Sequence, residues 1–342
     1  EYGYALLDAG RYPEALRQIE RYAQLNPDEP NPYDSLAEIY LVMGQPEEAF
    51  EKYSKILEID PQWPGIHYGR AIAAAMLGRF DEAFTELEAF RRTAAPPLAP
   101  SAYRFVTAGL LAKLGRYEEA GQLLAHDLDN LGGTAAAITE TSDRLLQIEF
   151  ALEEGRLDEA AKVAAAAVRS AESISDGFIR SHAKVAALSW AGIARARAGD
   201  RSAAGDFLAR ATAVSEAPGE VEGWCLGLLR GEIALTEGRL DEAGAVFQAA
   251  EPELKMPFSM TRYQPALLFN SCWLRDGRAR VMIEQGDIKG AIAVYKRLLT
   301  PGVASKYTSV LEPRYILELA RLLDRAGQSG EARTQYLRFV EL

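Results

Sequence analysis

The length, composition and charge of this chain exclude several classes of protein. Of its 342 residues, 48% are hydrophobic and 25% are charged, a balance typical of folded chains that bury a large apolar core and not of disordered ones. The formal net charge of −11 works against binding to a phosphate backbone, which depends on clustered Lys and Arg, so we expect no nucleic-acid partner.

A short motif, a glycine followed five residues later by an alanine, recurs along the whole chain. Its nine copies begin at Gly10, Gly44, Gly78, Gly115, Gly155, Gly199, Gly238, Gly286 and Gly327. Successive glycines are 34, 34, 37, 40, 44, 39, 48 and 41 residues apart, so the first three copies are in near-perfect register. Recurrence at such a period predicts a stack of nine short units in place of one large globular core.

Residues 30–63 show how one unit is expected to fold. Apolar residues of the first half are spaced as on one face of an α-helix, at Tyr33, Leu36, Ala37 and Tyr40. Gly44 can adopt the left-handed backbone conformation that ends a helix, and Pro46 suits the first turn of the next one. Asp60 and Pro61 stop this second helix, because proline has no N–H to donate and disfavours helical conformation in the preceding residue.

Small residues indicate where the two helices of each unit cross. Ala49 has an alanine counterpart in all nine units, and the residue twelve positions before it is Gly or Ala in eight of the nine. A larger side chain at either position would hold the two backbones apart. We therefore expect both positions to be closely packed.

The second unit resembles the tetratricopeptide repeat family in its order of aromatic, Leu, small, aromatic, Ala, aromatic and Pro, at Tyr33, Leu36, Ala37, Tyr40, Ala49, Tyr53 and Pro61. The resemblance weakens after Arg92. It implies an all-α fold, an α-solenoid of about nine antiparallel helix pairs whose later repeats exceed 34 residues. Through residues 26–36, the chain is also similar to tetratricopeptide arrays appended to bacterial signalling proteins that carry kinase, cyclase or winged-helix regulator domains.

A proline-rich stretch suggests how the array is divided. Residues 93–100 hold three prolines and are predicted to form a bend. We therefore place a regular block at 1–92 and longer, divergent repeats at 93–342.

The ends of the chain and one long loop are candidates for self-association. Gly3 matches the eighth position of a repeat, so we expect half of the first helix to be missing and the chain to be part of a longer protein. Apolar faces at uncapped terminal repeats favour a homodimer. The segment 251–265 is either a contact surface or folds back onto its own repeat, and it carries Met256, Phe258, Met260 and Tyr263.

Motifs for catalysis, metal binding or phosphate binding do not emerge from the sequence. The three histidines are far apart and form neither a HExxH motif nor a Cys-His set, so we expect surface or packing roles for His67, His126 and His182. The Glu-Glu and Asp-Glu pairs recur at the starts of helices, where negative charge stabilises the helix dipole. We predict that the chain is not an enzyme and needs no cofactor.

The family resemblance implies a concave groove lined by the first helix of each repeat. Carried onto this chain, the groove positions are Asp34, Glu38, Tyr68, Ile72, Phe105, Leu145, Glu149, Leu228, Glu232, Asp276, Arg280, Leu317 and Arg321. Family members that clamp a peptide carboxylate use Lys, Asn and Arg at such positions. Asp34 and Glu38 would repel a carboxylate, so a hydrophobic or basic partner segment suits this groove better.

We predict a non-catalytic protein–protein interaction scaffold or sensor module that binds a peptide or helix of a partner in its groove. The alternative is a self-association or regulatory module of a larger signalling protein. No apolar run approaches the roughly 18 residues that a membrane span needs. Cys225 and Cys272 are too few for a disulfide framework, which favours a reducing, cytoplasmic location.

Overall fold

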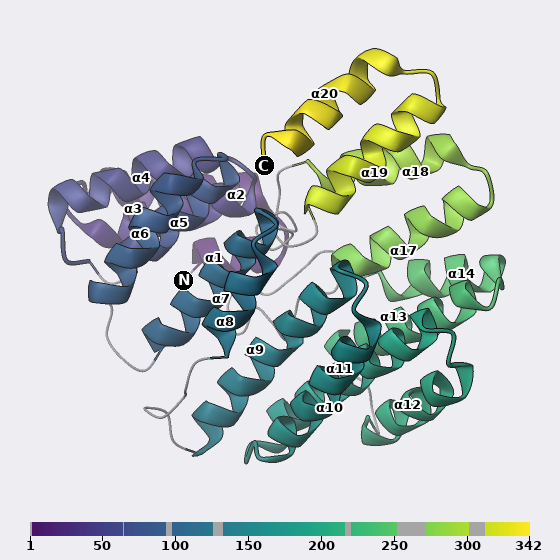
Figure 1. Cartoon of the computed structure of the whole chain (residues 1–342). Helices are drawn as coiled ribbons and strands as arrows, with labels where there is room; N and C mark the ends of the chain where they lie inside the picture. The colour runs from purple at the N-terminus through teal and green to yellow at the C-terminus, as the bar shows by residue number, and fades with distance from the viewer. Residues whose placement is uncertain are drawn as a thin grey trace. The chain divides into compact units, whose positions relative to one another are not determined.

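The helices of this protein pair in chain order, as the sequence predicts (Figure 1). The structure is a computed structural model that describes residues 2–63, 65–93, 98–125, 133–215, 220–251, 271–300 and 312–342. These residues form eighteen α-helices and no strand. The nine expected pairs and the all-α fold are therefore confirmed.

Each pair consists of two helices joined by a turn, and we number the pairs as hairpins one to nine. They are α1 (Tyr2–Asp8) with α2 (Tyr12–Leu25), α3 (Pro30–Val42) with α4 (Pro46–Ile59), α5 (Ile66–Met76) with α6 (Phe80–Thr93), α7 (Leu98–Lys113) with α8 (Tyr117–Leu124), α9 (Gly133–Glu153) with α10 (Leu157–Glu172), α11 (Gly177–Arg197) with α12 (Arg201–Val214), α13 (Glu220–Thr236) with α14 (Leu240–Ala250), α17 (Ser271–Glu284) with α18 (Ile288–Leu298), and α19 (Glu312–Arg325) with α20 (Ser329–Val340). Hairpins five and six are longer because their helices are longer: α9 and α11 have 21 residues each, against 13 in α3.

The turn glycines end the first helices in the expected way. All nine have positive φ, between 71° and 82°, which a residue without Cβ adopts at little cost. In the second hairpin, the Gly44 N–H donates to the Leu41 carbonyl and the Gln45 N–H to the Tyr40 carbonyl, at 3.2 and 2.8 Å. These two bonds satisfy carbonyls that the end of a helix otherwise leaves without partners.

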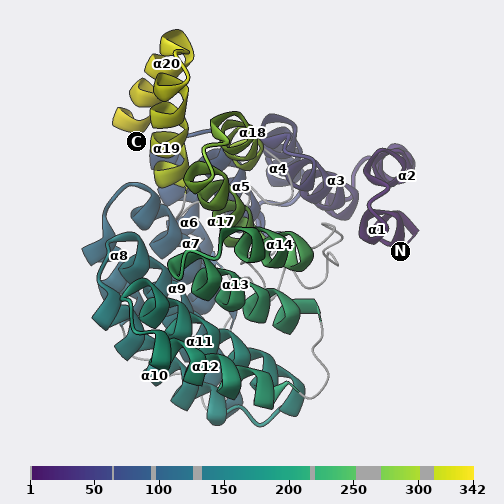
Figure 2. The same cartoon turned by 90° about the vertical axis from the view of Figure 1, so that its right-hand side faces the viewer.

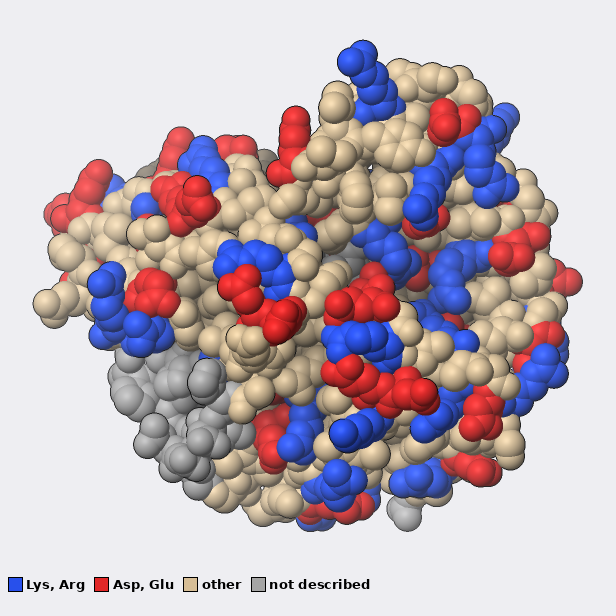
Figure 3. Space-filling view, viewed as in Figure 1, with Lys and Arg blue, Asp and Glu red and all other residues tan. Residues whose placement is uncertain are grey.

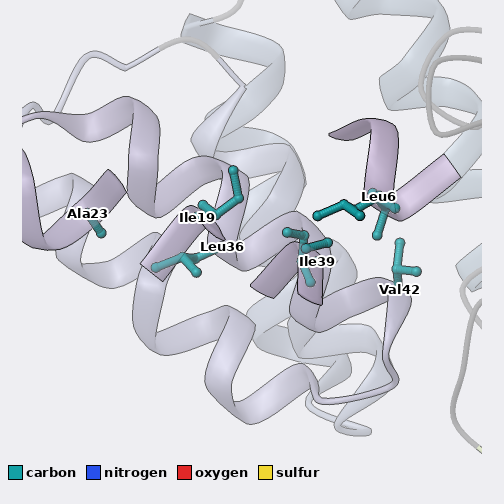
Figure 4. Packing of buried hydrophobic residues seen from close by; sticks show 8 residues of the cluster. Leu6, Ile19, Ala23, Leu36, Ile39 and Val42 are labelled. Atoms are coloured by element: carbon teal, nitrogen blue, oxygen red, sulfur yellow. The ribbon is translucent and has the colours of Figure 1, made fainter. Parts of the chain in front are cut away.

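The small residues lie at the helix crossings, as predicted. The alanine after each turn is almost fully buried in all nine hairpins, at Ala15, Ala49, Ala83, Ala120, Ala160, Ala204, Ala243, Ala291 and Ala332. Twelve positions before Ala204, a Cβ on Gly192 would lie 2.7 Å from a methyl carbon of Leu229. Figure 4 shows close packing in the first two hairpins, where the apolar side chains of α1, α2 and α3 point toward one another.

The helices group into two compact units. Unit 1 holds α1 to α6 and the part of α7 up to Leu110, and unit 2 holds the described helices from Leu111 onward. The boundary at 92/93 is drawn from the regularity of the repeats, which is a different property, and it stays a prediction. The segment 252–265 and His126 lie outside the described residues.

Neighbouring helices of unit 2 pack against each other in sequence. Helices α9, α10, α11 and α12 lie side by side, and α13, α14, α17, α18, α19 and α20 continue the series (Figures 1 and 2). The first helices α11, α13 and α17 also contact one another directly. None of the helices that the structure describes is long and apolar enough to cross a bilayer.

Candidate interaction surfaces

The predicted groove positions differ in exposure between the two units. In unit 1, four of the five are half-buried, at Asp34, Glu38, Tyr68 and Phe105, and Ile72 is 7% exposed. In unit 2, four lie in the interior, at Leu145, Leu228, Glu232 and Asp276. Another three of unit 2 are half-buried, at Glu149, Arg280 and Leu317, and Arg321 is exposed. By this measure, a larger share of the first-helix positions is partly exposed in unit 1 than in unit 2.

In unit 1, the acidic pair lies beside a tyrosine of the preceding hairpin. The Tyr4 hydroxyl of α1 reaches Ser35 Oγ at 2.8 Å and Glu38 Oε2 at 3.2 Å, both on α3. Burial and the nearby Glu38 and Asp34 carboxylates raise the pKa of Tyr4 above its ordinary value, so its hydroxyl stays neutral and can donate. These two hydrogen bonds join α1 of the first hairpin to α3 of the second.

The aromatic residues of the same face are anchored in the core of unit 1. The Tyr68 ring packs at 5.4 Å from the ring of Phe90 on α6, in a tilted arrangement. Ile72, one turn further along α5, belongs to the apolar cluster that Tyr68 and Val106 cover. Tyr68 and Phe105 therefore have half-exposed rings, and that of Tyr68 packs on the core of unit 1. They lie on the first helices of the two hairpins that follow α3, which carries Asp34 and Glu38.

In unit 2, the same helix faces carry a network of charged side chains. Arg197 of α11 donates to Glu232 of α13 at 2.8 and 3.2 Å, and Arg280 of α17 donates to the same carboxylate at 2.5 Å. The Glu232 side chain has no exposed surface, so its negative charge is cut off from water. The two guanidinium groups that face its carboxylate offset the cost of burying that charge.

A second part of the network centres on Arg314 of α19. Its Nε donates to Glu153 Oε2 of α9 and its Nη1 to Asp276 Oδ1 of α17, both at 2.7 Å. The Tyr295 hydroxyl of α18 donates to the same Asp276 oxygen at 2.9 Å. Arg314 thus links three hairpins.

Aromatic rings separate the two parts of the network. Trp190 of α11 and Trp273 of α17 meet edge to face, with ring centroids 5.1 Å apart. The guanidinium carbons of Arg197 and Arg314 lie 5.0 and 5.5 Å from the Trp273 ring, within the range of a cation–π interaction.

The carboxyl groups of this network differ in their pKa values according to their partners. Burial and the adjacent Glu153 carboxylate raise the pKa of Glu149 to about 8. Trp273 acts in the opposite direction and makes this rise smaller. Burial also raises the pKa of Glu153, and Arg314 only partly offsets it. For Glu232, burial acts in the same direction, but Arg197 and Arg280 outweigh it and lower the pKa to about 2.

Several members of the network are missing from the predicted groove positions, and four of them share two places in the repeat, at Glu153, Arg197, Trp273 and Arg314. The predicted positions lie ten and six residues before the turn glycine. The missing four lie two or thirteen residues before it, and these two positions would have identified them.

The charged side chains of this network are paired with one another. The carboxylate of Glu232 accepts from two guanidinium groups that lower its pKa to about 2, which leaves it a poor base. Among the described residues, no three His, Cys, Asp or Glu side chains are grouped to hold a metal ion. On the face seen in Figure 3, acidic and basic side chains are interspersed.

Comparison with known proteins places the regular repeats in a family. Two family models, both described as tetratricopeptide repeat, match residues 2–64 and 64–89. The chain is 33% identical over 108 residues to the tetratricopeptide repeat and J domain-containing co-chaperone DNJ1 of Cryptococcus neoformans. That match covers 32% of this chain and 21% of the co-chaperone, so it spans about a fifth of the relative's length.

Two solved structures align with this chain at low sequence identity, and the first shows the same fold. A tetratricopeptide repeat protein from Parabacteroides merdae aligns with a TM-score of 0.51 and 17% identity, over 82% of this chain and 96% of that one. The human IFIT1 dimer with m7Gppp-AAAA aligns with a TM-score of 0.46 and 14% identity, over 91% of this chain and 68% of that one. The second TM-score is too low to support a functional comparison.

Proposed function

Because this chain is a tetratricopeptide repeat protein, we propose that it is an interaction scaffold that binds a partner peptide or helix on the first-helix face of unit 1. The observation that carries the proposal is the difference between the units. Asp34, Glu38, Tyr68 and Phe105, four of the five positions of unit 1, keep part of their surface exposed, whereas four of the eight equivalent side chains of unit 2 lie in the interior. The family models also match within unit 1.

The chemistry of this face suits a segment that is basic, apolar or both. Asp34 and Glu38 bring negative charge within one helical turn of each other, and Tyr68 and Phe105 offer aromatic surface. Lys or Arg next to a hydrophobic anchor would complement both features. A peptide carboxylate would be repelled by the carboxylates of Asp34 and Glu38.

Selection from a random peptide library tests this proposal. Selected peptides are expected to be enriched in basic and aromatic or aliphatic residues. In fluorescence anisotropy titrations, Tyr68→Ala and the double variant Asp34→Asn with Glu38→Gln should each weaken binding at least about tenfold, as interface anchors do. Arg321→Ala, at an exposed equivalent position of unit 2, is the matched control and should bind like the parent chain. Equal affinity in all four proteins would refute the proposed surface.

Self-association is a second candidate, and it rests on the surface of α20. Leu337 and Val340 are 52% and 79% exposed, beside a hollow of about 320 Å³ that α19 and α20 line together. Asp324 and Arg333 flank this hollow with opposite charges, so two copies related by a two-fold axis can place unlike charges together. We propose a homodimer through α20 as the form that self-association takes.

Light scattering across a concentration series distinguishes the two candidates. If α20 mediates association, the mass rises with concentration and Leu337→Glu abolishes the rise. Leu25→Glu, which places the same charge at an exposed leucine of unit 1, is the control. A mass that stays monomeric at all concentrations rules out the second candidate.

The remaining proposals concern cellular context. We propose that the array serves a larger signalling protein in the cytoplasm, on the resemblance of residues 26–36 and the scarcity of cysteine.

A further inference from the structure

The hairpins of unit 2 make contacts that skip over their neighbours. In an open solenoid, each repeat contacts only the repeats next to it. Here Trp190 of hairpin six meets Trp273 of hairpin eight. Arg314 of hairpin nine bonds Glu153 of hairpin five, 161 residues away in sequence.

A second long-range ion pair joins the last hairpin to α7, which precedes hairpin five. Lys113, the last residue of α7, places Nζ 2.6 Å from Glu312 Oε2 at the start of α19, 199 residues away in sequence. The two side chains are only 8% and 16% exposed, so solvent screens this ion pair weakly. The last hairpin of unit 2 is therefore tied to its first helices by two separate ion pairs.

Packing alone does not require these charges. Adjacent hairpins of this protein are joined by buried alanine and other apolar side chains. Burying ionised groups costs free energy, and apolar replacements of buried ion pairs are often as stable or more so. Within the described residues, Asp276 Oδ2 and Arg314 Nη2 have no hydrogen-bond partner, so some polar atoms of the network are buried without a hydrogen bond. Such a network holds the hairpins of unit 2 less rigidly than one in which every polar atom is hydrogen-bonded.

We infer that Lys113–Glu312 and Glu153–Arg314 form an electrostatic clasp that holds unit 2 closed. Release of the clasp separates α19 from α7 and α9 and exposes Trp190 and Trp273, which are about 1% exposed in the closed form. The inference is independent of partner binding by unit 1.

The clasp is tested in the full chain with two variants that each remove one pair. Lys113→Met keeps the apolar stem and removes the ammonium group, and Glu153→Gln keeps the shape and removes the charge. Either variant should raise amide hydrogen exchange at least about tenfold in α19, although neither substitution is in that helix. The radius of gyration from small-angle scattering and acrylamide quenching of tryptophan fluorescence should rise with it.

Glu119→Gln is the matched control. It removes the exposed Arg116–Glu119 pair of α8, whose 2.7 Å distance is similar but whose partners are three residues apart. Exchange in α19 should not change. Faster exchange confined to the substituted helix, with unchanged scattering, would overturn the clasp. If Lys113→Met does not fold, the isosteric Glu153→Gln decides between the same two outcomes.

Discussion

The alanine that follows each turn glycine is almost fully buried in all nine hairpins. At Ala49 the residue has no exposed surface, and its crossing partner Ala37 has none either. Because helices approach this closely only where both side chains are small, the two positions constrain each other. The constraint comes from the sequence pattern alone and the structure confirms it.

Enlarging this alanine should destabilise the fold. Ala49→Leu is expected to lower the free energy of unfolding by about 1–3 kcal/mol, because three extra carbons must displace the neighbouring helix. Glu51→Gln, two residues away and exposed, should change it by less than about 0.5 kcal/mol. Urea melts of the three proteins measure both values, and equal losses would contradict the packing described here.

Glu149 should make stability fall as pH rises from about 4.5 to about 8. Its pKa is raised to about 8 in the folded state, so its proton stabilises the fold at low pH, and this contribution is lost as pH rises toward and through 8. Between pH 6 and pH 9, the melting temperature should fall less in Glu149→Gln than in the parent chain. Parallel melting curves of the two proteins would show that Glu149 ionises normally.

Glu232 should act in the opposite direction at acid pH. Its folded pKa of about 2 lies below the ordinary value, so its stabilising contribution is present above about pH 4.5 and is lost as pH falls through 2. Glu232→Gln is expected to lower stability at pH 7, because Arg197 and Arg280 lose their shared partner, and the loss should shrink toward pH 2. A loss of the same size at both pH values, measured by urea melts, would contradict this assignment.

At the scale of the element, two glycines of one hairpin should respond oppositely to alanine. Gly199 ends α11 with φ of +80°, and a Cβ there would meet nothing within 4 Å, so only backbone strain opposes the change. Gly199→Ala should cost about 1 kcal/mol. Gly205 lies inside α12 in equally open space, so Gly205→Ala should stabilise the protein by about 0.5–1 kcal/mol. Thermal melts give both signs, and a shared sign would refute the role of the turn.

The hairpins were predictable because their causes are local. Gly44, Pro46 and the apolar spacing of residues 30–63 determine two helices and one turn without reference to distant residues. Burial of Leu145 and Asp276 was not predictable in this way. It depends on how the small rotation between successive hairpins accumulates, which no single repeat reveals. The network around Arg314 depends on the same accumulated rotation, because its partners come from hairpins five and eight.

At the scale of the whole molecule, the two units should differ in how they unfold. In unit 2, α9 and α19 are bonded to each other, so loosening one removes a contact of the other. Native-state hydrogen exchange in rising urea should give these helices a common free energy of opening. In unit 1, where α1 packs on α2, we expect α1 to open at lower free energy than α5. A last hairpin that frays well before α9 would contradict the coupling.

In an open stack of repeats, each repeat contacts only its neighbours, so inserting or removing one leaves the remaining contacts in place. The bond between Glu153 and Arg314 spans hairpins five to nine, so the two side chains meet only when the right number of hairpins lies between them. Duplicating or deleting one of those hairpins would carry Arg314 away from its partner. Unit 2 is thus tied to its present repeat number, whereas in the described part of unit 1 the Tyr4 hydroxyl of α1 joins neighbouring hairpins through Ser35 and Glu38 of α3.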